Sequence, residues 1–191
     1  MRGVLWCNGS IPTESVVEWV LTTGAPVFGV DGGCDKAHSC GIEVFEVLGD
    51  MDSLDESAWK GRTLPLNEQT FSDLAKSIRE LIHRGFDEIE IVGADGGDPS
   101  HILGNWAAMN DAPSGARIRI HHEEQVSTRL HPDDEGFSAE FEEESCSLFS
   151  LLRQVRSGYQ GPNGNYTGMT WAYHREAVSY THLTLPTKRI V

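Results

Sequence analysis

Long uncharged apolar runs and an excess of positive charge are both missing from this sequence. No stretch approaches about 18 uncharged apolar residues, so we expect no membrane-spanning helix. The 191 residues include 29 Asp and Glu against 15 Lys and Arg, a net charge of −14. A negative surface attracts neither anionic membranes nor duplex nucleic acid, so neither is an expected partner. The N-terminal segment lacks the apolar core of a signal peptide, which makes the cytoplasm the expected location.

The sequence is also poor in cysteine and lacks the common nucleotide-binding fingerprints. Its four cysteines, Cys7, Cys34, Cys40 and Cys146, form no CxxC pair, and their spacing fits no common zinc site. Small buried residues are the favoured interpretation for most of them. Neither GxxxxGK[ST] nor GxGxxG occurs, which excludes a Walker loop and a dinucleotide fingerprint. Any nucleotide is therefore expected to be held by a metal ion and by turns.

Short apolar runs alternate with helical patterns through the first 110 residues. The clearest helix is predicted over residues 72–84, where Leu74, Ile78 and Leu81 fall on one face and Gly85 ends the pattern. The alternation predicts a parallel α/β sheet covered on both faces. The predicted strands cover residues 3–7, 25–30, 44–48 and 88–92, and the other predicted helices cover residues 13–21 and 101–109.

The pattern changes at residues 110–116 (NDAPSGA), which are a linker by composition. Beyond it, short alternating segments separated by turn residues predict a small all-β, sandwich-like domain. We therefore predict an α/β domain over residues 1–112 and part of a β domain over residues 117–177. The last segment, residues 178–191 (VSYTHLTLPTKRIV), resembles the translation of a sequencing-library adapter, so we expect it to be an artefact.

Acidic residues follow the predicted strands of the α/β domain directly. Asp50 and Asp52 come after the strand that ends at residue 48, and Asp73 lies in the first turn of the following clear helix. In an open parallel sheet, ligands bind beyond the carboxyl ends of the strands, so we expect these three carboxylates to meet at one sheet edge. Packed carboxylates repel each other unless a cation joins them, and Mg²⁺ prefers hard oxygen ligands. The sequence therefore predicts a Mg²⁺ site made by Asp50, Asp52 and Asp73.

Each of these acids also has an ordinary local interpretation. Asp-x-Asp-Ser after a strand is typical of a turn and a helix N-cap, and Asp73 would favour the dipole of its own helix. Their joint position at one sheet edge favours the metal site. Residues 121–124 (HHEE) invite a second metal-site interpretation. Adjacent strand residues point to opposite faces, however, so a solvated strand end is favoured there.

These motifs resemble the thiamine pyrophosphokinase (thiamine diphosphokinase) family. The resemblance covers roughly residues 4–110, and its most specific part is the GDxDS segment with a following Ser-Asp-Leu. The five segments that carry it are Asn8-Gly9, Asp31-Gly32-Gly33, Gly49-Asp50-Met51-Asp52-Ser53, Glu68-Gln69-Thr70-Phe71-Ser72-Asp73-Leu74, and Gly96-Gly97-Asp98-Pro99-Ser100-His101 with Asn105.

The resemblance implies a homodimeric, ATP-dependent pyrophosphokinase. Such an enzyme transfers a pyrophosphoryl group from ATP to the hydroxyl of thiamine and releases AMP, with Mg²⁺ stabilising charge on the phosphate oxygens. It implies catalytic roles for Asp50, Asp52, Asp73 and Gln69, with the three aspartates as Mg²⁺ ligands. Contacts to the nucleotide are implied for Asn8, Gly9, Asp31, Gly32, Gly33, Ser53, Ser72, Gly96, Gly97 and Asn105.

Two positions depart from the family pattern. Asp98 and Ser100 stand where the family has an arginine and an aspartate. This departure motivates one alternative, a non-catalytic nucleotide-binding relative. A second alternative is a pyrophosphokinase for another alcohol, such as a hydroxymethyl pterin, that uses the same acids at the sheet edge.

Overall fold

The chain divides into two compact units, Met1–His131 and Pro132–Val191. The computed structural model describes most of the first unit and the strands of the second, with side chains described as far as residue 134. The described residues are 1–52, 54, 58–131, 133–134, 139–141, 145–149, 154–160, 166–172, 180–184 and 188–190.

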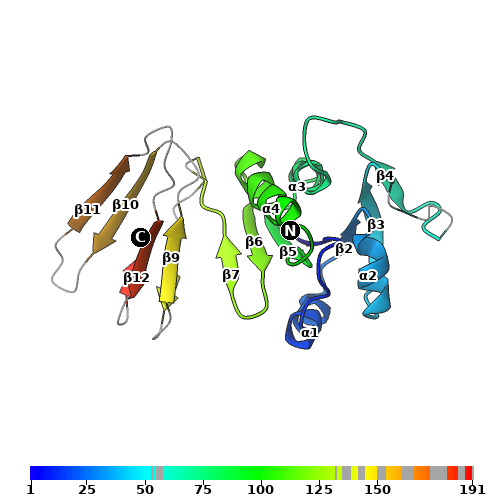
Figure 1. The fold of residues 1–191 in the computed structure, drawn as a ribbon, viewed down its shortest axis with the longest axis horizontal. Helices are drawn as coiled ribbons and strands as arrows, with labels where there is room; N and C mark the ends of the chain where they lie inside the picture. Colours follow the sequence, from blue (N-terminus) through cyan, green and yellow to red (C-terminus); the bar gives the residue numbers. More distant parts are fainter. Residues whose placement is uncertain are drawn as a thin grey trace. The chain divides into compact units, whose positions relative to one another are not determined.

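The first unit is built on a seven-stranded sheet with the order β4-β3-β2-β1-β5-β6-β7 (Figure 1). All neighbouring strands in it are parallel except β6 and β7, which are antiparallel. The sheet is therefore mostly parallel, as the alternating pattern predicts. The strands are β1 (Arg2–Trp6), β2 (Val27–Val30), β3 (Val44–Gly49), β4 (Thr63–Pro65), β5 (Glu88–Val92), β6 (Arg117–His121) and β7 (Val126–Thr128).

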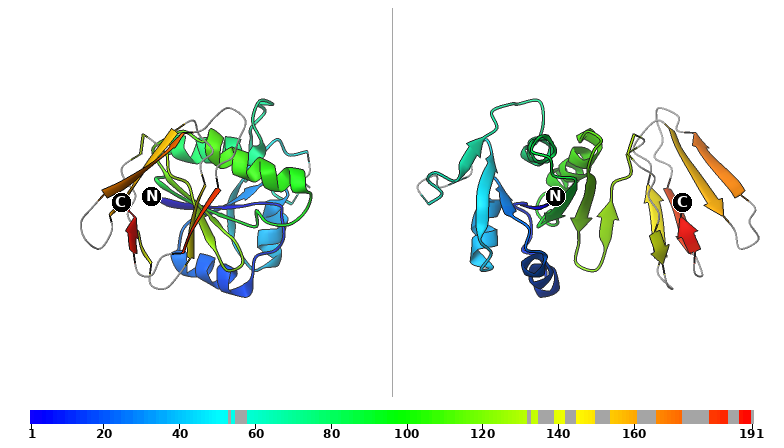
Figure 2. Two further views of the ribbon diagram at one scale, coloured as in Figure 1. Left: turned by 60° about the vertical axis from the view of Figure 1, so that its left-hand side comes forward. Right: turned by 180° about the vertical axis from the view of Figure 1, so that it is seen from behind.

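Four helices cover the two faces of this sheet. One hydrophobic cluster joins α3 and α4 to one face through residues such as Ile78, Leu81 and Met109. A second cluster joins α1 and α2 to the other face through Val20, Cys34 and neighbouring side chains. Figures 1 and 2 show these two helix pairs on opposite sides of the sheet. The helices are α1 (Glu14–Thr23), α2 (Gly33–Ser39), α3 (Asp73–His83) and α4 (Pro99–Asp111).

The helices and strands predicted for the α/β domain are confirmed to within two residues at their ends. The predicted helix over residues 72–84 is α3, which begins after an N-cap at Ser72 and ends before Gly85. Among the described residues of the first unit, two short elements have no counterpart in the prediction, α2 and β4. The seven residues of α2 are too few for a clear helical period, and β4 has only three residues.

The boundary between the two units lies later than the sequence predicts. Strand β6 pairs in parallel with β5, and β7 returns beside β6, so residues 117–128 complete the first sheet. The first unit accordingly extends to His131 rather than to residue 112. The reason is that the alternating pattern of β6, with buried Ile118 and Ile120, is the same whether the strand belongs to an antiparallel domain or to the edge of this sheet.

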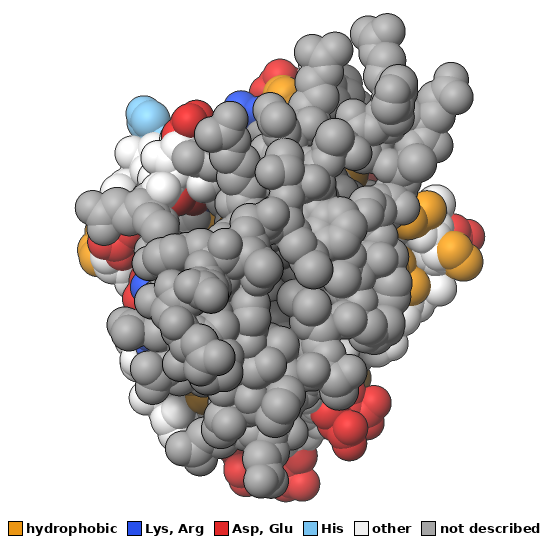
Figure 3. Space-filling view, turned by 90° about the vertical axis from the view of Figure 1, so that its left-hand side faces the viewer, with side chains coloured by type: hydrophobic (Ala, Val, Ile, Leu, Met, Phe, Trp, Pro, Cys, Tyr) orange, Lys and Arg blue, Asp and Glu red, His pale blue; other side chains and the backbone are white. Residues whose placement is uncertain are grey.

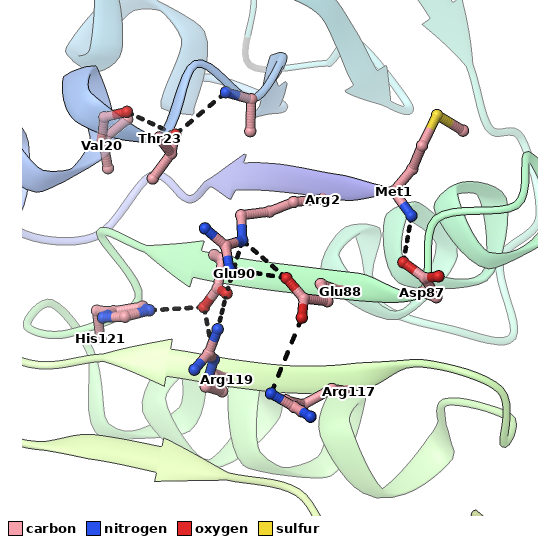
Figure 4. A network of polar contacts seen from close by, with 11 residues as sticks. Met1, Arg2, Val20, Thr23, Asp87, Glu88, Glu90, Arg117, Arg119 and His121 are labelled. Carbon is pink, nitrogen blue, oxygen red and sulfur yellow. Dashed lines mark hydrogen bonds and ion pairs between the residues drawn. The ribbon is translucent and has the colours of Figure 1, made fainter.

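The face of β5 and β6 on the α1 side carries charged residues. Glu90 is fully buried, forms an ion pair with Arg119 and is hydrogen-bonded to His121, whose Nε2 lies 2.7 Å from Oε2 (Figure 4). Arg2 Nε approaches Glu90 Oε1 at 3.6 Å, and Trp19 of α1 stacks on the His121 ring at 4.1 Å between centroids. The chain's own cations therefore neutralise this buried carboxylate.

The second unit consists of short strands where it is described. Strands β11 (Tyr166–Ala172), β10 (Gln154–Gln160), β13 (Lys188–Ile190) and β8 (Ala139–Phe141) form one sheet in that order. Strands β12 (Tyr180–Thr184) and β9 (Ser145–Phe149) form another. A sandwich-like arrangement of the strands beyond the first unit and an artefactual segment over residues 178–191 stay predictions.

The surface agrees with the composition. Acidic side chains form red patches at the margins of the face in Figure 3, and basic side chains show as small blue areas. Among the described residues, no helix is long and apolar enough to cross a bilayer.

Candidate functional site

Loops that follow four strands lie at the carboxyl edge of the parallel sheet. The loops after β2 and β3 form what we call the acid side, made of Asp31, Asp50 and Asp52. The loops after β1 and β5 form what we call the glycine side, made of Gly9 and residues 93–97. The strand order reverses direction at β1, which lies between β2 and β5. Ligands of open α/β sheets bind beyond such a reversal, so both sides belong to one candidate site.

On the acid side, three carboxylates converge. Asp31, Asp50 and Asp52 each offer an oxygen that lies within 4.8 Å of the others. Asp31 and Asp50 are half-buried, and Asp52 is exposed. The loops hold this arrangement through the Asp31 amide, which donates to Leu48 O at 2.9 Å, and the Asp52 amide, which donates to Asp50 Oδ1 at 3.3 Å.

Two residues of the acid side adopt left-handed backbone conformations. Asp31 has φ 48° and Met51 has φ 67°. Aspartate tolerates this region better than most residues, but for Met51 the conformation costs about 1–2 kcal/mol. The Met51 side chain is buried in the cluster under α1 and α2, which holds the turn in place. Asp50 and Asp52 therefore flank Met51, whose side chain is buried.

Three carboxylates at this spacing suit a divalent cation. Like charges so close together repel each other, and a hard cation with oxygen ligands removes that repulsion. The set differs from the predicted one in a single member, since Asp31 stands with Asp50 and Asp52 where the sequence predicts Asp73. Asp31 directly follows β2, which pairs with β3, so the sheet itself brings the Asp31 carboxylate to this position.

Asp73 has a different immediate partner. It is the first residue of α3, and its Oδ1 lies 2.7 Å from Lys76 Nζ. Lys76 is buried and also donates to Leu66 O at 2.8 Å. The hydrogen bond from Lys76 therefore joins the start of α3 to the segment after β4, and the ion pair holds Asp73 beside Lys76. Gln69 lies exposed in that same loop, and Ser53 lies outside the described residues.

The glycine side is tied together by its own backbone. Gly9 N donates to Gly93 O at 2.8 Å, and Ser10 N donates to Asp95 O at 2.5 Å. A Cβ on Gly9 would overlap both of these carbonyl oxygens, so the two loops can approach only because this residue is glycine. Asn105 of α4 donates from Nδ2 to Ala94 O at 2.7 Å. The predicted nucleotide contact Asn105 thus holds the loop that contains Gly96 and Gly97.

A lysine and the Asp31-Gly32-Gly33 turn join the two sides. Lys36 of α2 donates from Nζ to Asn8 O at 2.7 Å and to Gly9 O at 2.5 Å. A Cβ on Gly33 would overlap Trp6 O, and one on Gly32 would lie 2.7 Å from Asn8 Nδ2. Gly32 therefore lies against Asn8, Gly33 lies against the end of β1, and Lys36 adds a positive charge that the sequence reasoning missed.

Two predicted polar residues act as helix caps. Ser72 Oγ accepts from Ala75 N at 3.3 Å at the start of α3. Asp98 Oδ1 accepts from Ser100 N at 2.8 Å at the start of α4, and this hydrogen bond holds the pKa of Asp98 below its usual range. The family departure at position 98 therefore has a local structural role, with Pro99 as the first helical residue.

In the HHEE segment, Glu123 and Glu124 are exposed as the sequence predicts, but the two histidines are more buried than a solvated strand end would be. His121 and His122 do point to opposite faces, but neither is a solvated residue: His121 contacts Glu90 on the α1 side, and His122 contacts Asp95 on the α4 side. Their side chains are 11% and 20% exposed. The partners come from β5 and its loop, about 30 residues earlier, and no local pattern marks them.

The fold and the position of this site define an open, mostly parallel α/β protein whose candidate site lies beyond the carboxyl ends of its strands. Comparison with protein families finds a match to the thiamin pyrophosphokinase catalytic domain over residues 20–120, more than half of the chain. The chain belongs to this family. The comparison with curated protein sequences found no match.

Solved structures of thiamin pyrophosphokinases have a similar fold. The enzyme from Geobacillus thermodenitrificans has a TM-score of 0.63 and 14% identity, with 100% of this chain and 92% of that chain covered. The Bacillus subtilis enzyme has a TM-score of 0.63 and 16% identity, with 100% and 93% covered. The Candida albicans enzyme has a TM-score of 0.57 and 11% identity, with 99% and 84% covered.

Proposed function

We propose that this protein is a thiamine pyrophosphokinase, which transfers a pyrophosphoryl group from ATP to the hydroxyl of thiamine and releases AMP. The observation that carries the proposal is the convergence of Asp31, Asp50 and Asp52 at the carboxyl edge of the sheet, in a chain of this family. The thiamine oxygen attacks the β-phosphorus, AMP leaves, and no protein nucleophile is needed.

Asp31, Asp50 and Asp52 would hold Mg²⁺, because their oxygens already lie within 4.8 Å of one another. When bound, this ion supplies positive charge to the phosphate oxygens of ATP. Asp73 stays a proposed contributor near the same edge, and its pairing with Lys76 links any movement of the carboxylate to the start of α3. Gln69 stays a proposed polar contact, together with Ser53 and Ser72.

The glycine side would bind the phosphate groups of ATP. Loops without side chains allow a close approach of the backbone, and their amides donate to anions. Lys36 adds a cation between the two sides, where it would attract a triphosphate. We also propose, from the family, a cytoplasmic homodimer in which ATP and thiamine meet between the subunits.

The direct test measures AMP release from ATP, thiamine and Mg²⁺. We expect AMP only when all three are present, and we expect Asp50→Asn to lower the rate by about 100-fold or more. Asp111→Asn, at the exposed end of α4, is the matched control and should keep the parent rate.

The same assay separates the two alternatives. AMP release with a hydroxymethyl pterin but not with thiamine would replace the proposed substrate. Mg²⁺-dependent ATP binding without AMP release from either alcohol would favour a non-catalytic relative. If Asp50→Asn bound and used ATP as well as the parent protein does, the metal assignment would be wrong.

A further inference from the structure

Three polar side chains form a chain of contacts behind the glycine side. Asp95 Oδ1 lies 2.7 Å from His122 Nδ1, and His122 Nε2 lies 2.9 Å from Ser127 Oγ. Asp95 belongs to the loop after β5, His122 follows β6, and Ser127 lies in β7. We propose that His122 is a positioning residue that fixes the loop of residues 93–97 in the shape that receives the ATP phosphates.

The His122 imidazole also has contacts beyond Asp95 and Ser127. The ring of Trp106 stacks on His122, with 5.9 Å between centroids and 19° between planes. The His122 amide donates to Gln125 O at 2.8 Å, which closes the turn between β6 and β7. The ring is therefore fixed by α4 and by the hairpin, and it presents Nδ1 to Asp95. A rigid donor of this kind can position a loop.

The loop of residues 93–97 needs such support where Gly96 and Gly97 follow Asp95. Its backbone is bonded at Gly93, Ala94 and Asp95 to the loop after β1 and to Asn105. Gly96 and Gly97 follow, both in left-handed conformations with φ 73° and 78°. Glycines lose more conformational freedom than other residues when they are ordered. The Asp95 side chain is the last one before these glycines, so its bond to His122 limits the freedom of the residues on which phosphate binding is proposed to depend.

The hydrogen-bond directions support a positioning role. In neutral imidazole, Nδ1–H donates to the Asp95 carboxylate and Nε2 accepts from the Ser127 hydroxyl. In the protonated ring both nitrogens donate, and the Asp95 contact persists. His122 therefore holds the same loop position in either state. The consequence for ATP rests on the proposed function, whereas the effect on the loop does not.

Two substitutions at His122 separate its two contacts. Asn places its amide near the position of Nδ1 and can keep the bond to Asp95, whereas Gln reaches the position of Nε2 and loses that bond. His121→Gln is the matched control, because it lies one residue away on the opposite face. Asp95→Ala removes the same bond from the other side and serves if His122→Gln folds poorly.

The first readout is hydrogen exchange, which requires no activity. We expect the amides of residues 93–97 to exchange about tenfold faster in His122→Gln and Asp95→Ala, and within twofold of the parent in His122→Asn and His121→Gln. Amides of β5 should be unchanged in all four. Unchanged exchange of the loop in His122→Gln would overturn the proposal, whether or not the protein is a kinase.

The second readout is the division between KM and kcat. In His122→Gln we expect the KM for ATP to rise about fivefold to tenfold, while the KM for thiamine and kcat stay within twofold. A general loss of stability would not give this division, and His122→Asn should restore the KM. An equal fall of kcat in all variants would overturn the positioning role. Covalent labelling of Ser127 by a fluorophosphonate would also overturn it, because Ser127 would then be an activated nucleophile.

Discussion

The acid side and the glycine side of the sheet edge are built in different ways. On the acid side, three carboxylates face one another within 4.8 Å, on two turns with left-handed residues. On the glycine side, polar groups are bonded to each other, as in the pairs Gly9–Gly93, Asn105–Ala94 and His122–Asp95. The acid side thus brings together negative charges that a cation would neutralise. On the glycine side, hydrogen bonds fix the position of the backbone.

This difference shows how one sheet edge can serve two parts of a ligand. Charged side chains at the ends of β2 and β3 suit a metal ion, and close-packed backbone at the ends of β1 and β5 suits phosphate oxygens. Substitutions on the acid side should therefore change ion binding with little effect on folding. Substitutions on the glycine side should change the fold of the edge itself.

The largest effects should come from substituting Asp31, which converges with Asp50 and Asp52, and Asp73, which the sequence predicts in its place. Asp31→Asn should lower kcat/KM by about 100-fold and weaken Mg²⁺ activation, because it removes one of the three converging carboxylates. Asp73→Asn should instead lower the free energy of unfolding by about 2–3 kcal/mol, because buried Lys76 loses its ion partner.

Magnesium titrations of AMP release and urea unfolding without Mg²⁺ measure these two effects separately. The opposite result, with Mg²⁺ activation lost in Asp73→Asn and kept in Asp31→Asn, would restore the ligand set that the sequence predicts.

The next effect tests the close packing of the glycine side. Gly9→Ala should lower the free energy of unfolding by about 1–3 kcal/mol, because its Cβ would overlap the carbonyl oxygens of Gly93 and Asp95. Gly104→Ala, in the open surface of α4, is the control and should stabilise the protein by about 0.5–1 kcal/mol. Calorimetric unfolding of both variants measures these free energies. A Gly9→Ala protein as stable as the parent would show that the two loops can separate.

Glu90 provides a carboxylate that the chain neutralises by itself. Burial raises its pKa, but hydrogen bonds from His121 and Arg119 more than offset this, so the pKa lies below its ordinary value of 4.5. The folded state therefore binds fewer protons than the unfolded state, and this stabilisation is present above about pH 4.5 and lost as the pH falls through the lowered value. Glu90→Gln should cost about 2 kcal/mol at pH 7.

Urea unfolding of the parent and Glu90→Gln across pH 3 to 7 measures the difference between them. We expect this difference to shrink below about pH 4.5 and to be the same with and without Mg²⁺. A difference that stayed constant with pH would show that the Gln side chain is unfavourable for reasons of packing.

The smallest effect concerns two cysteines, one near each side. Burial raises the pKa of Cys7 to about 12, and burial with the charges of Asp35 and Asp31 raises the pKa of Cys34 to about 12. We expect iodoacetamide at pH 8 to modify both at least about 100-fold more slowly in the folded chain than in urea. Half-buried Cys40 is the internal comparison. Rapid modification of Cys34 alone would show that the acid side opens in solution.

Much of the fold was predictable because its signals are local. The helix α3 follows from apolar residues at helical spacing, a Ser72 cap and a terminal glycine. The strands β1, β2, β3 and β5 follow from short, mostly apolar segments between turn residues, and most of their residues are buried. The placement of β6 was not predictable, because its alternation fits an antiparallel domain as well as the edge of this sheet.

The candidate site was predictable in part for the same reason. Asp50 and Asp52 were identified because they follow a strand directly, and their convergence is found in the structure. Asp31 was predicted to contact the nucleotide, and its convergence with Asp50 and Asp52 was not predicted, because no local pattern shows the strand order that places β2 beside β3. The same holds for Lys36 and His122, whose partners lie about 30 residues away in sequence.

The sequence alone determined the α/β class, the acids at the strand ends and the family resemblance, because apolar periodicity and short motifs act within a few residues. Only the tertiary structure decided which acids converge, which polar groups are held by partners, and where the first unit ends. Those properties depend on strand order and on contacts between distant segments, and local patterns carry no information about either.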